Sequence, residues 1–177
     1  MIFTETAIPG AFVIDVERVE DERGFFARTW SEDELRDHGL DPTVVQCNLS
    51  YNARQATLRG LHYQRTPHEE TKIVRCTAGA IHDVVVDLRR SSPAYRKWTA
   101  VELTAENRRM LYIPHGVAHG FITLTDASEV HYQMGARYVA EAAAGVRWDD
   151  PAFGIEWPLE PLVISERDRS FPLWKES

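Results

Sequence analysis

The fold of this chain is constrained above all by short runs of strand-forming residues that recur along its length. Some runs alternate apolar and polar residues and others are continuously apolar, as expected for half-buried and fully buried strands. Clusters of Gly, Pro, Asn or Ser separate them at short intervals. The runs are Phe12–Val19, Lys72–Cys76, Ile81–Leu88, Thr99–Leu103, Met110–Ile113, His119–Leu124 and Glu129–Met134. This pattern predicts an all-β sandwich or barrel rather than alternating strands and helices.

Helical signals are few. Ser31 is a predicted N-cap with Glu34 at the capping-box position, and the short helix that follows is expected to run through Leu35. After Gly145 the chain is expected to be extended or to wrap the barrel surface, because it contains Pro151, Pro158, Pro161 and Pro172. A length of 177 residues without repeat or linker predicts one domain, 1–177.

Composition disfavours several classes of partner. The formal net charge is -7 and there is no run of Lys or Arg, so nucleic acid is not the expected ligand. A small anion still fits, because a few arginines can focus positive potential in an acidic protein. No apolar stretch reaches membrane-spanning length and no signal peptide is recognisable. Cys47 and Cys76 are expected to be free thiols, which together predict a cytoplasmic protein.

Two histidine-containing motifs bear on the kind of barrel. Pro114-His-Gly-Val-Ala-His119 fits the PxGxxH signature of the cupins. The resemblance implies a cupin-like double-stranded β-helix (jelly-roll) barrel with a few short helices. Arg59-Gly-Leu-His-Tyr-Gln64 stands where cupins carry an HxH metal motif, but it contains His62-x-Gln64. Glu69 or Glu70 could supply a carboxylate, yet glutamine is a poor ligand for Fe or Zn, so we expect no catalytic metal.

Pocket histidines without a metal set favour acid–base catalysis by side chains. Removing a proton next to a carbonyl requires a base, an acid on the opposite face and a donor for the enolate oxygen. His62 is the candidate base, Tyr132 the candidate acid, and Lys72 or His119 the group for the enolate. Lys72 shares a strand face with apolar residues, so its ammonium either enters the pocket or reaches solvent at the strand end. Asp83 is expected to face the cavity.

Further segments, ordered along nearly the whole chain, carry a more specific resemblance. They are Asp21-Glu-Arg-Gly-Phe-Phe26, Val45-Gln-Cys-Asn48, Leu58-Arg-Gly-Leu-His-Tyr-Gln64, Ile113-Pro-x-Gly-x-Ala-His-Gly-Phe121, Gly145-Val-Arg-Trp-Asp-Asp-Pro151 and Ile164-Ser-Glu-Arg-Asp168. With them the chain resembles the dTDP-4-dehydrorhamnose 3,5-epimerase family, the nucleotide-sugar epimerases of L-rhamnose biosynthesis. The resemblance implies a homodimer with strand exchange and catalysis without a cofactor.

The resemblance also implies a role for individual residues. The reaction would convert dTDP-4-keto-6-deoxy-D-glucose into dTDP-4-keto-L-rhamnose, with His62 as base, Asp168 as its partner, Tyr132 as acid and Lys72 at the enolate. The implied substrate-binding residues are Arg59 and His119 at the diphosphate or keto-sugar edge, and Arg23, Gln46, Asn48, Tyr138 and Arg167 at the nucleotide end. These types suit the ligand, since diphosphates bind arginine forks and bases stack on aromatic rings.

Two positions depart from the family pattern and leave alternatives open. Arg28 and Ala143 stand where the family usually carries acidic residues near the nucleotide. The nucleotide identity, and whether C3, C5 or both are inverted, therefore stay open. The alternatives are a C3-only or C5-only epimerase of another NDP-4-keto-6-deoxyhexose, a metal-dependent cupin isomerase or oxygenase, and a non-catalytic sugar-nucleotide binding module.

Overall fold

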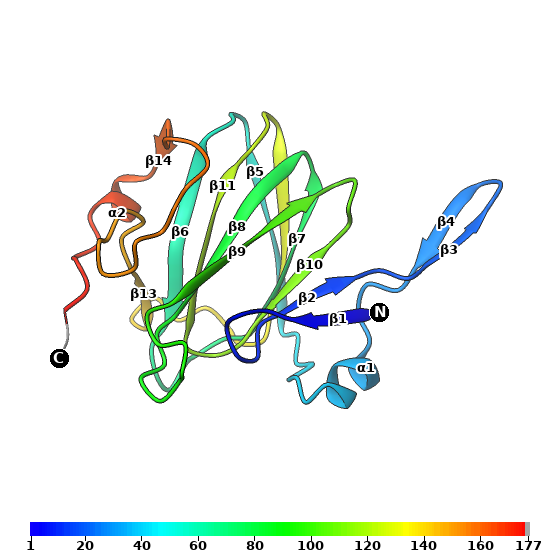
Figure 1. Cartoon of the computed structure of the whole chain (residues 1–177), viewed down its shortest axis with the longest axis horizontal. Coiled ribbons are helices and arrows are strands. Elements are labelled where there is room, and N and C mark those ends of the chain that lie inside the picture. Colours follow the sequence, from blue (N-terminus) through cyan, green and yellow to red (C-terminus); the bar gives the residue numbers. More distant parts are fainter. Residues whose placement is uncertain (176–177) are drawn as a thin grey trace.

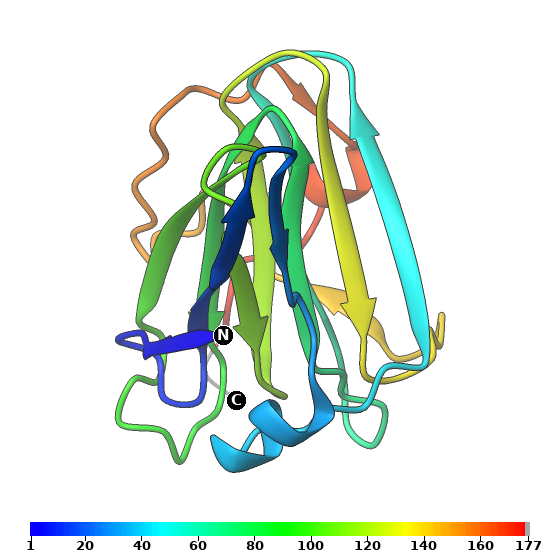
Figure 2. The same ribbon diagram turned by 90° about the vertical axis from the view of Figure 1, so that its right-hand side faces the viewer.

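The computed structural model describes residues 1–175, which form mainly two β-sheets packed face to face (Figures 1 and 2). The first sheet has the order β1 (Ile2–Glu5), β2 (Phe12–Asp15), β10 (Met110–Ile113), β7 (Lys72–Ala78), β12 (Ser128–Met134) and β5 (Gln46–Asn52). The second has the order β13 (Ala143–Gly145), β6 (Thr57–Gln64), β11 (Val117–Thr123), β8 (Ala80–Asp87) and β9 (Trp98–Thr104), and β14 (Val163–Ile164) pairs in parallel with β6. The predicted all-β, cupin-like barrel is confirmed.

Apolar side chains from both sheets fill the space between them. Val74, Val85, Leu111, Phe121 and Val130 belong to this core and are at most 1% exposed. Burial of each such large side chain contributes about 1.5–3 kcal/mol. The alternation expected in β7 holds, because Val74 and Cys76 enter the core. This core fixes the positions of the polar side chains farther along the same strands.

Both sheets are also covered on part of their outer faces. Helix α1 (Glu32–Asp37) buries Leu35 against Ile73 and Met110 of the first sheet. Ser31 caps it as predicted, its hydroxyl accepting a hydrogen bond from the Glu34 amide at 3.5 Å. The chain after Gly145 packs Trp148 and Trp157 against the second sheet, so every residue of β11 is buried. Neither helix of the described chain has the length and apolar character that a membrane crossing requires.

The predicted strand Phe12–Val19 is wrong in its extent. The structure divides it into β2 and β3 (Arg18–Asp21), and β3 pairs with β4 (Gly24–Ala27) rather than with either sheet. This hairpin projects away from the barrel (Figure 1). The break follows from the charged residues after Asp15, which leave only exposed positions in β3.

Strands β6 and β11 approach each other unusually closely. A Cβ atom on Gly60 would lie 2.5 Å from the Gly120 Cα, and Gly60 has a φ of +127°. Only glycine therefore fits at position 60 without moving backbone. The strand register shifts between His119 and Phe121 at this point, and His62 is left directly opposite His119.

Candidate active site

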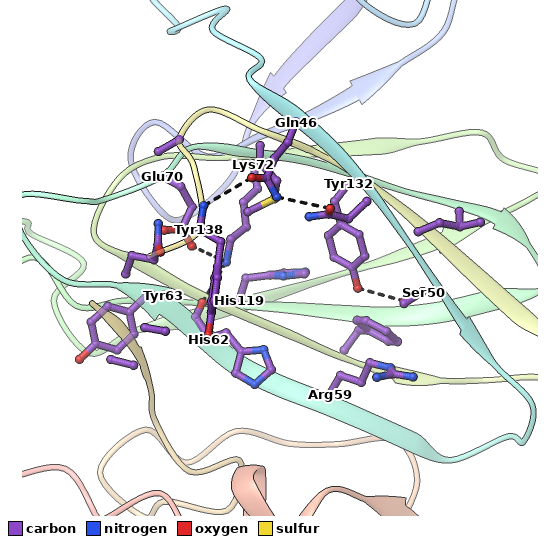
Figure 3. A pocket seen from close by; sticks show the side chains of 18 of the residues that line it. Gln46, Ser50, Arg59, His62, Tyr63, Glu70, Lys72, His119, Tyr132 and Tyr138 are labelled. Carbon is purple, nitrogen blue, oxygen red and sulfur yellow. Dashed lines mark hydrogen bonds and ion pairs between the residues drawn. The ribbon is translucent and has the colours of Figure 1, made fainter. Parts of the chain in front are cut away.

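A cavity of about 590 Å³ opens between the two sheets (Figure 3). First-sheet strands β5, β7 and β12 supply one wall, and second-sheet strands β6, β11 and β13 supply the other. Most residues predicted from the sequence line it: Gln46, Asn48, Arg59, His62, Lys72, His119, Tyr132, Tyr138 and Arg167. Residues far apart in sequence are thus brought together at one place.

His62 on β6 forms a hydrogen-bonded pair with Asp168. His62 Nε2 lies 2.7 Å from Asp168 Oδ1, and Asp168 Oδ2 accepts a hydrogen bond from the Gly60 amide at 3.2 Å. The carboxylate is delivered by α2 (Glu166–Arg169), whose N-cap Ser165 accepts from the Asp168 amide. An ionised carboxylate only accepts, so Nε2 carries the proton and Nδ1 keeps its lone pair for use as a base.

The surroundings of Asp168 keep its carboxyl ionised. Burial acts to raise its pKa, but the hydrogen bond and charge of His62 and the Gly60 amide outweigh burial, and the pKa lies below its ordinary value of 3.8. A carboxyl whose pKa is lowered by folding stabilises the native state above its unfolded pKa. That contribution disappears as the pH falls through the lower, folded-state pKa.

We expect Asp168→Asn to show this dependence directly. At neutral pH the variant should have a lower free energy of unfolding than the wild type, by about 1–3 kcal/mol, since a charged hydrogen-bond partner is lost. The difference should shrink as the pH falls below about 4. Urea unfolding of both proteins across this pH range measures it. A difference that stays constant with pH would contradict a lowered Asp168 pKa.

Tyr132 faces the cavity from β12, in the sheet opposite His62 (Figure 3). Its hydroxyl lies 3.3 Å from the Ser50 Oγ. Burial raises the pKa of Tyr132 well above its ordinary value of 10, despite the Ser50 hydrogen bond and the charge of Arg59, which act in the other direction. The phenol therefore carries its proton at neutral pH, as a general acid requires.

The Lys72 ammonium lies in the cavity. Strand alternation had left two alternatives open for it, the pocket or solvent at the strand end. The residue is 6% exposed, and its Nζ donates to the His62 carbonyl at 3.0 Å and lies 3.1 Å from Glu70 Oε1. Glu70, considered above as a metal ligand, is the counter-ion of this ammonium. A buried cation at this position is suited to stabilising negative charge on an oxygen.

His119 and Asp83 form a second buried pair. His119 Nε2 lies 2.6 Å from Asp83 Oδ1, and the two residues are 4% and 0% exposed. The His119 ring meets the Tyr132 ring edge-on, with 6.2 Å between centroids. Asp83 therefore lies inside the barrel behind His119 and orients it, but it does not line the cavity as predicted.

Gln64 has a structural role. Its amide nitrogen donates to the carbonyls of His68 and Arg137 at 2.8 and 3.1 Å, and its oxygen accepts from the Val139 amide at 2.6 Å. These bonds brace the segment that carries Tyr138. Among residues 1–175 no group of three or more His, Cys, Asp or Glu side chains is arranged to hold a metal ion.

The end of the cavity that was predicted to bind the nucleotide is built from β5 and residues 136–138. The Tyr138 amide donates to Gln46 Oε1 at 3.4 Å, and Gln46 donates to Asn48 at 3.3 Å. The Tyr138 side chain is 61% exposed, so its ring is open to stacking. Arg59 is held by Asn52 Oδ1 at 2.7 Å.

Arg23 does not lie at the cavity of its own chain. It sits in the turn of the β3–β4 hairpin, pairs with Asp21, and its side chain is 84% exposed. The cause is the hairpin, which projects from the barrel and carries Arg23 with it (Figure 1). Arg28 also stays outside, paired with Glu34 at 2.7 Å, whereas Ala143 lines the cavity.

Sequence reasoning missed the supporting roles of several residues. Ser50, Glu70 and Ser165 contact Tyr132, Lys72 and Asp168, respectively. Only Ser165 had a local signal, since a serine three residues before an acidic residue is a capping pattern. Ser50 contacts Tyr132 from the neighbouring strand β5, and Glu70 lies in the loop just before β7, where no capping or strand pattern marks it.

A histidine–carboxylate pair and a partly buried phenol on opposite walls of one cavity define a cupin-fold protein equipped for proton transfer. The model of the family described as dTDP-4-dehydrorhamnose 3,5-epimerase matches residues 5–176. The chain belongs to this family.

Individual relatives agree over nearly the full length. The dTDP-4-dehydrorhamnose 3,5-epimerase of Methanothermobacter thermautotrophicus is 44% identical, covering 99% of this chain and 95% of its own. The Bacillus anthracis enzyme, solved with TDP and PPi bound, has a TM-score of 0.94 at 38% identity and covers 98% of this chain and 99% of its own. A 3'-monoepimerase of Streptomyces bikiniensis, solved with dTDP-quinovose, has a TM-score of 0.87 at 33% identity, with 95% and 85% coverage.

Proposed function

We propose that this protein epimerises dTDP-4-keto-6-deoxy-D-glucose at C3 and C5 to give dTDP-4-keto-L-rhamnose, without a cofactor. The observation that carries the proposal is the placement of His62 and Tyr132 on facing sheets of one cavity. A base on one side of the sugar and an acid on the other give inversion, since the proton leaves one face and returns to the opposite one.

The other cavity residues fit successive parts of this reaction. The C4 ketone acidifies the protons on C3 and C5, and the enolate formed by His62 needs a cation at its oxygen. Lys72 supplies that charge. Arg59, His119 and Arg167 suit the diphosphate and the keto-sugar edge, and Tyr138 offers a face for the base.

Deuterium incorporation in D₂O tests the proposal. The protein is incubated with dTDP-4-keto-6-deoxy-D-glucose, and label is located by proton NMR and mass spectrometry. Label at C3 and C5 with inverted products is the expected result. Label at one carbon alone would support the monoepimerase alternative, to which the Streptomyces bikiniensis relative lends weight, and no label from folded protein would reject the activity on this substrate.

We also propose that the protein is a homodimer in which the β3–β4 hairpin reaches the cavity of the other copy. The hairpin exposes Val19 at 70% and Phe26 at 77%, which is costly unless another surface covers them. Strand β5 is the last strand of the first sheet, and its Leu49 and Tyr51 are 58% and 60% exposed. Exchange of the hairpin would bring Arg23 to a partner's nucleotide end.

Subunit complementation tests this arrangement. We expect His62→Asn and Arg23→Ala homodimers each to have low activity. Unfolding and refolding them together should restore about a quarter of wild-type activity, because half the dimers would be mixed and each would hold one complete site. Analytical ultracentrifugation provides the control for assembly. No gain on mixing, with dimers present, would place Arg23 outside the partner's site.

A cytoplasmic location remains a prediction from the free thiols Cys47 and Cys76.

A further inference from the structure

Phe171, which follows α2 and its C-cap Ser170, packs beside His62 at a position that a glycine leaves open. A Cβ atom on Gly145 would lie 2.3 Å from both Cε2 and Cζ of the Phe171 ring. Gly145 pairs with His62 across β13 and β6. Because Gly145 has no side chain, the Phe171 ring fits at the strand position that pairs with His62.

The Phe171 ring also meets the imidazole itself. The two ring centroids are 6.0 Å apart with an interplanar angle of 71°, an edge-to-face arrangement. The His62 side chain is 40% exposed, so the barrel core does not fix its rotamer. Two contacts from the short segment 168–171 hold it instead: Asp168 bonds Nε2, and Phe171 limits rotation of the ring.

We propose that Phe171 is a positioning residue for His62, an inference that rests on the function proposed above. Phe171 is not among the side chains that line the cavity, so it acts through the base and not on the sugar. Proton abstraction depends steeply on geometry, and a displacement of about 1 Å can cost about 100-fold in rate. Fixing the imidazole therefore raises turnover without adding affinity.

The Phe171 ring also lies near a cation, Arg167, at the predicted nucleotide end of the cavity. The Arg167 guanidinium lies 5.9 Å from the Phe171 ring centroid, and Arg167 lines the cavity. Arg167 and Asp168 are neighbours in α2. A diphosphate that engages Arg167 thus meets the segment that also orients His62.

Three variants separate positioning from general anchoring of the chain end. Phe171→Ala removes the ring, and Phe171→Leu restores most of its bulk. Tyrosine is unsuitable, since its hydroxyl would extend from Cζ, which already occupies the space that a Cβ at position 145 would take. Trp174→Ala is the matched control, because it removes a ring that packs on Phe153 and anchors the same segment without an aromatic contact to His62. The Trp174 backbone amide, which donates to Asp150 at 2.5 Å, is kept in this variant.

We expect Phe171→Ala to lower kcat for deuterium exchange about 10- to 100-fold, with KM and the Kd for dTDP changed less than about threefold. Phe171→Leu should recover most of the rate, and Trp174→Ala should lower thermal stability with little change in kcat. In ¹⁵N NMR, the wild-type His62 should show the Nε2–H tautomer alone, and Phe171→Ala a mixture.

Other results would overturn the inference. Equal losses of kcat in Phe171→Ala and Trp174→Ala would make Phe171 an anchor only. A loss of dTDP affinity as large as the loss of kcat would indicate that the site as a whole had collapsed. If the wild type exchanges no deuterium, the proposed function fails, and the His62 tautomer in the two proteins still decides whether Phe171 positions the ring.

Discussion

Replacing His62 with Asn should abolish deuterium exchange at both C3 and C5, with a fall of at least about 1,000-fold in kcat. The asparagine side chain can still hydrogen-bond Asp168, but it has no lone pair basic enough to take a carbon-bound proton. Because Lys72 bonds the backbone carbonyl of residue 62 and not its side chain, the ammonium should stay in place. The variant should therefore bind dTDP normally.

The measurement is the exchange rate in D₂O together with the Kd for dTDP and the unfolding midpoint. A matched control is His82→Asn, since His82 lies on β8 and packs beside Trp157, outside the cavity. Retained exchange in folded His62→Asn protein would remove His62 from the role of base and return Tyr132 or His119 to consideration.

Replacing Tyr132 with Phe should separate proton loss from inversion. His62 still removes the proton, and the enolate persists beside Lys72, but no acid stands on the opposite face. We expect inverted product to form about 100- to 1,000-fold more slowly. Deuterium should still enter the substrate with retained configuration, because the base can return a proton to the face from which it came.

Proton NMR distinguishes labelled substrate from labelled epimer in one experiment. Ser50→Ala is the companion variant, since it removes the hydroxyl 3.3 Å from the phenol and leaves the phenol itself. It should slow inversion only modestly. Full inversion by Tyr132→Phe would show that another group, or water, protonates the second face.

The strands that the sequence predicts are those whose apolar pattern is uninterrupted. Runs in β7, β8 and β11 are recognisable because the core requires an apolar residue at alternate positions or throughout. Strand β6 was missed, although it has eight residues and pairs with β11, β13 and β14. Gly60 and the cavity-facing Arg59 and His62 disrupt the alternation of apolar and polar residues in this strand. The residues that the site requires therefore remove the sequence pattern by which the strand would be recognised. Helix α2 has four residues, too few for helical periodicity.

The site was predictable to a similar, limited extent. Motifs and the family resemblance identify His62, Lys72, Tyr132 and Asp168, because each lies in or near a recognisable segment. The supports of these groups were not predictable, since Ser50 and Phe171 act through contacts between distant parts of the chain. Arg23 shows the opposite case. Its motif is recognisable in the sequence, but the exposed Arg23 side chain lies away from the cavity of its own chain.

The close contact of Gly60 with Gly120 has a consequence for how two stereocentres can be served by one base. It holds the backbones of β6 and β11 at a close separation, and the His62 and His119 side chains are each bound to a buried carboxylate. Tyr132 is fixed in the opposite sheet. None of these groups has freedom to travel from one carbon to the next. For the proposed double epimerisation we therefore expect the hexose, and not the protein, to turn within the cavity between the two inversions.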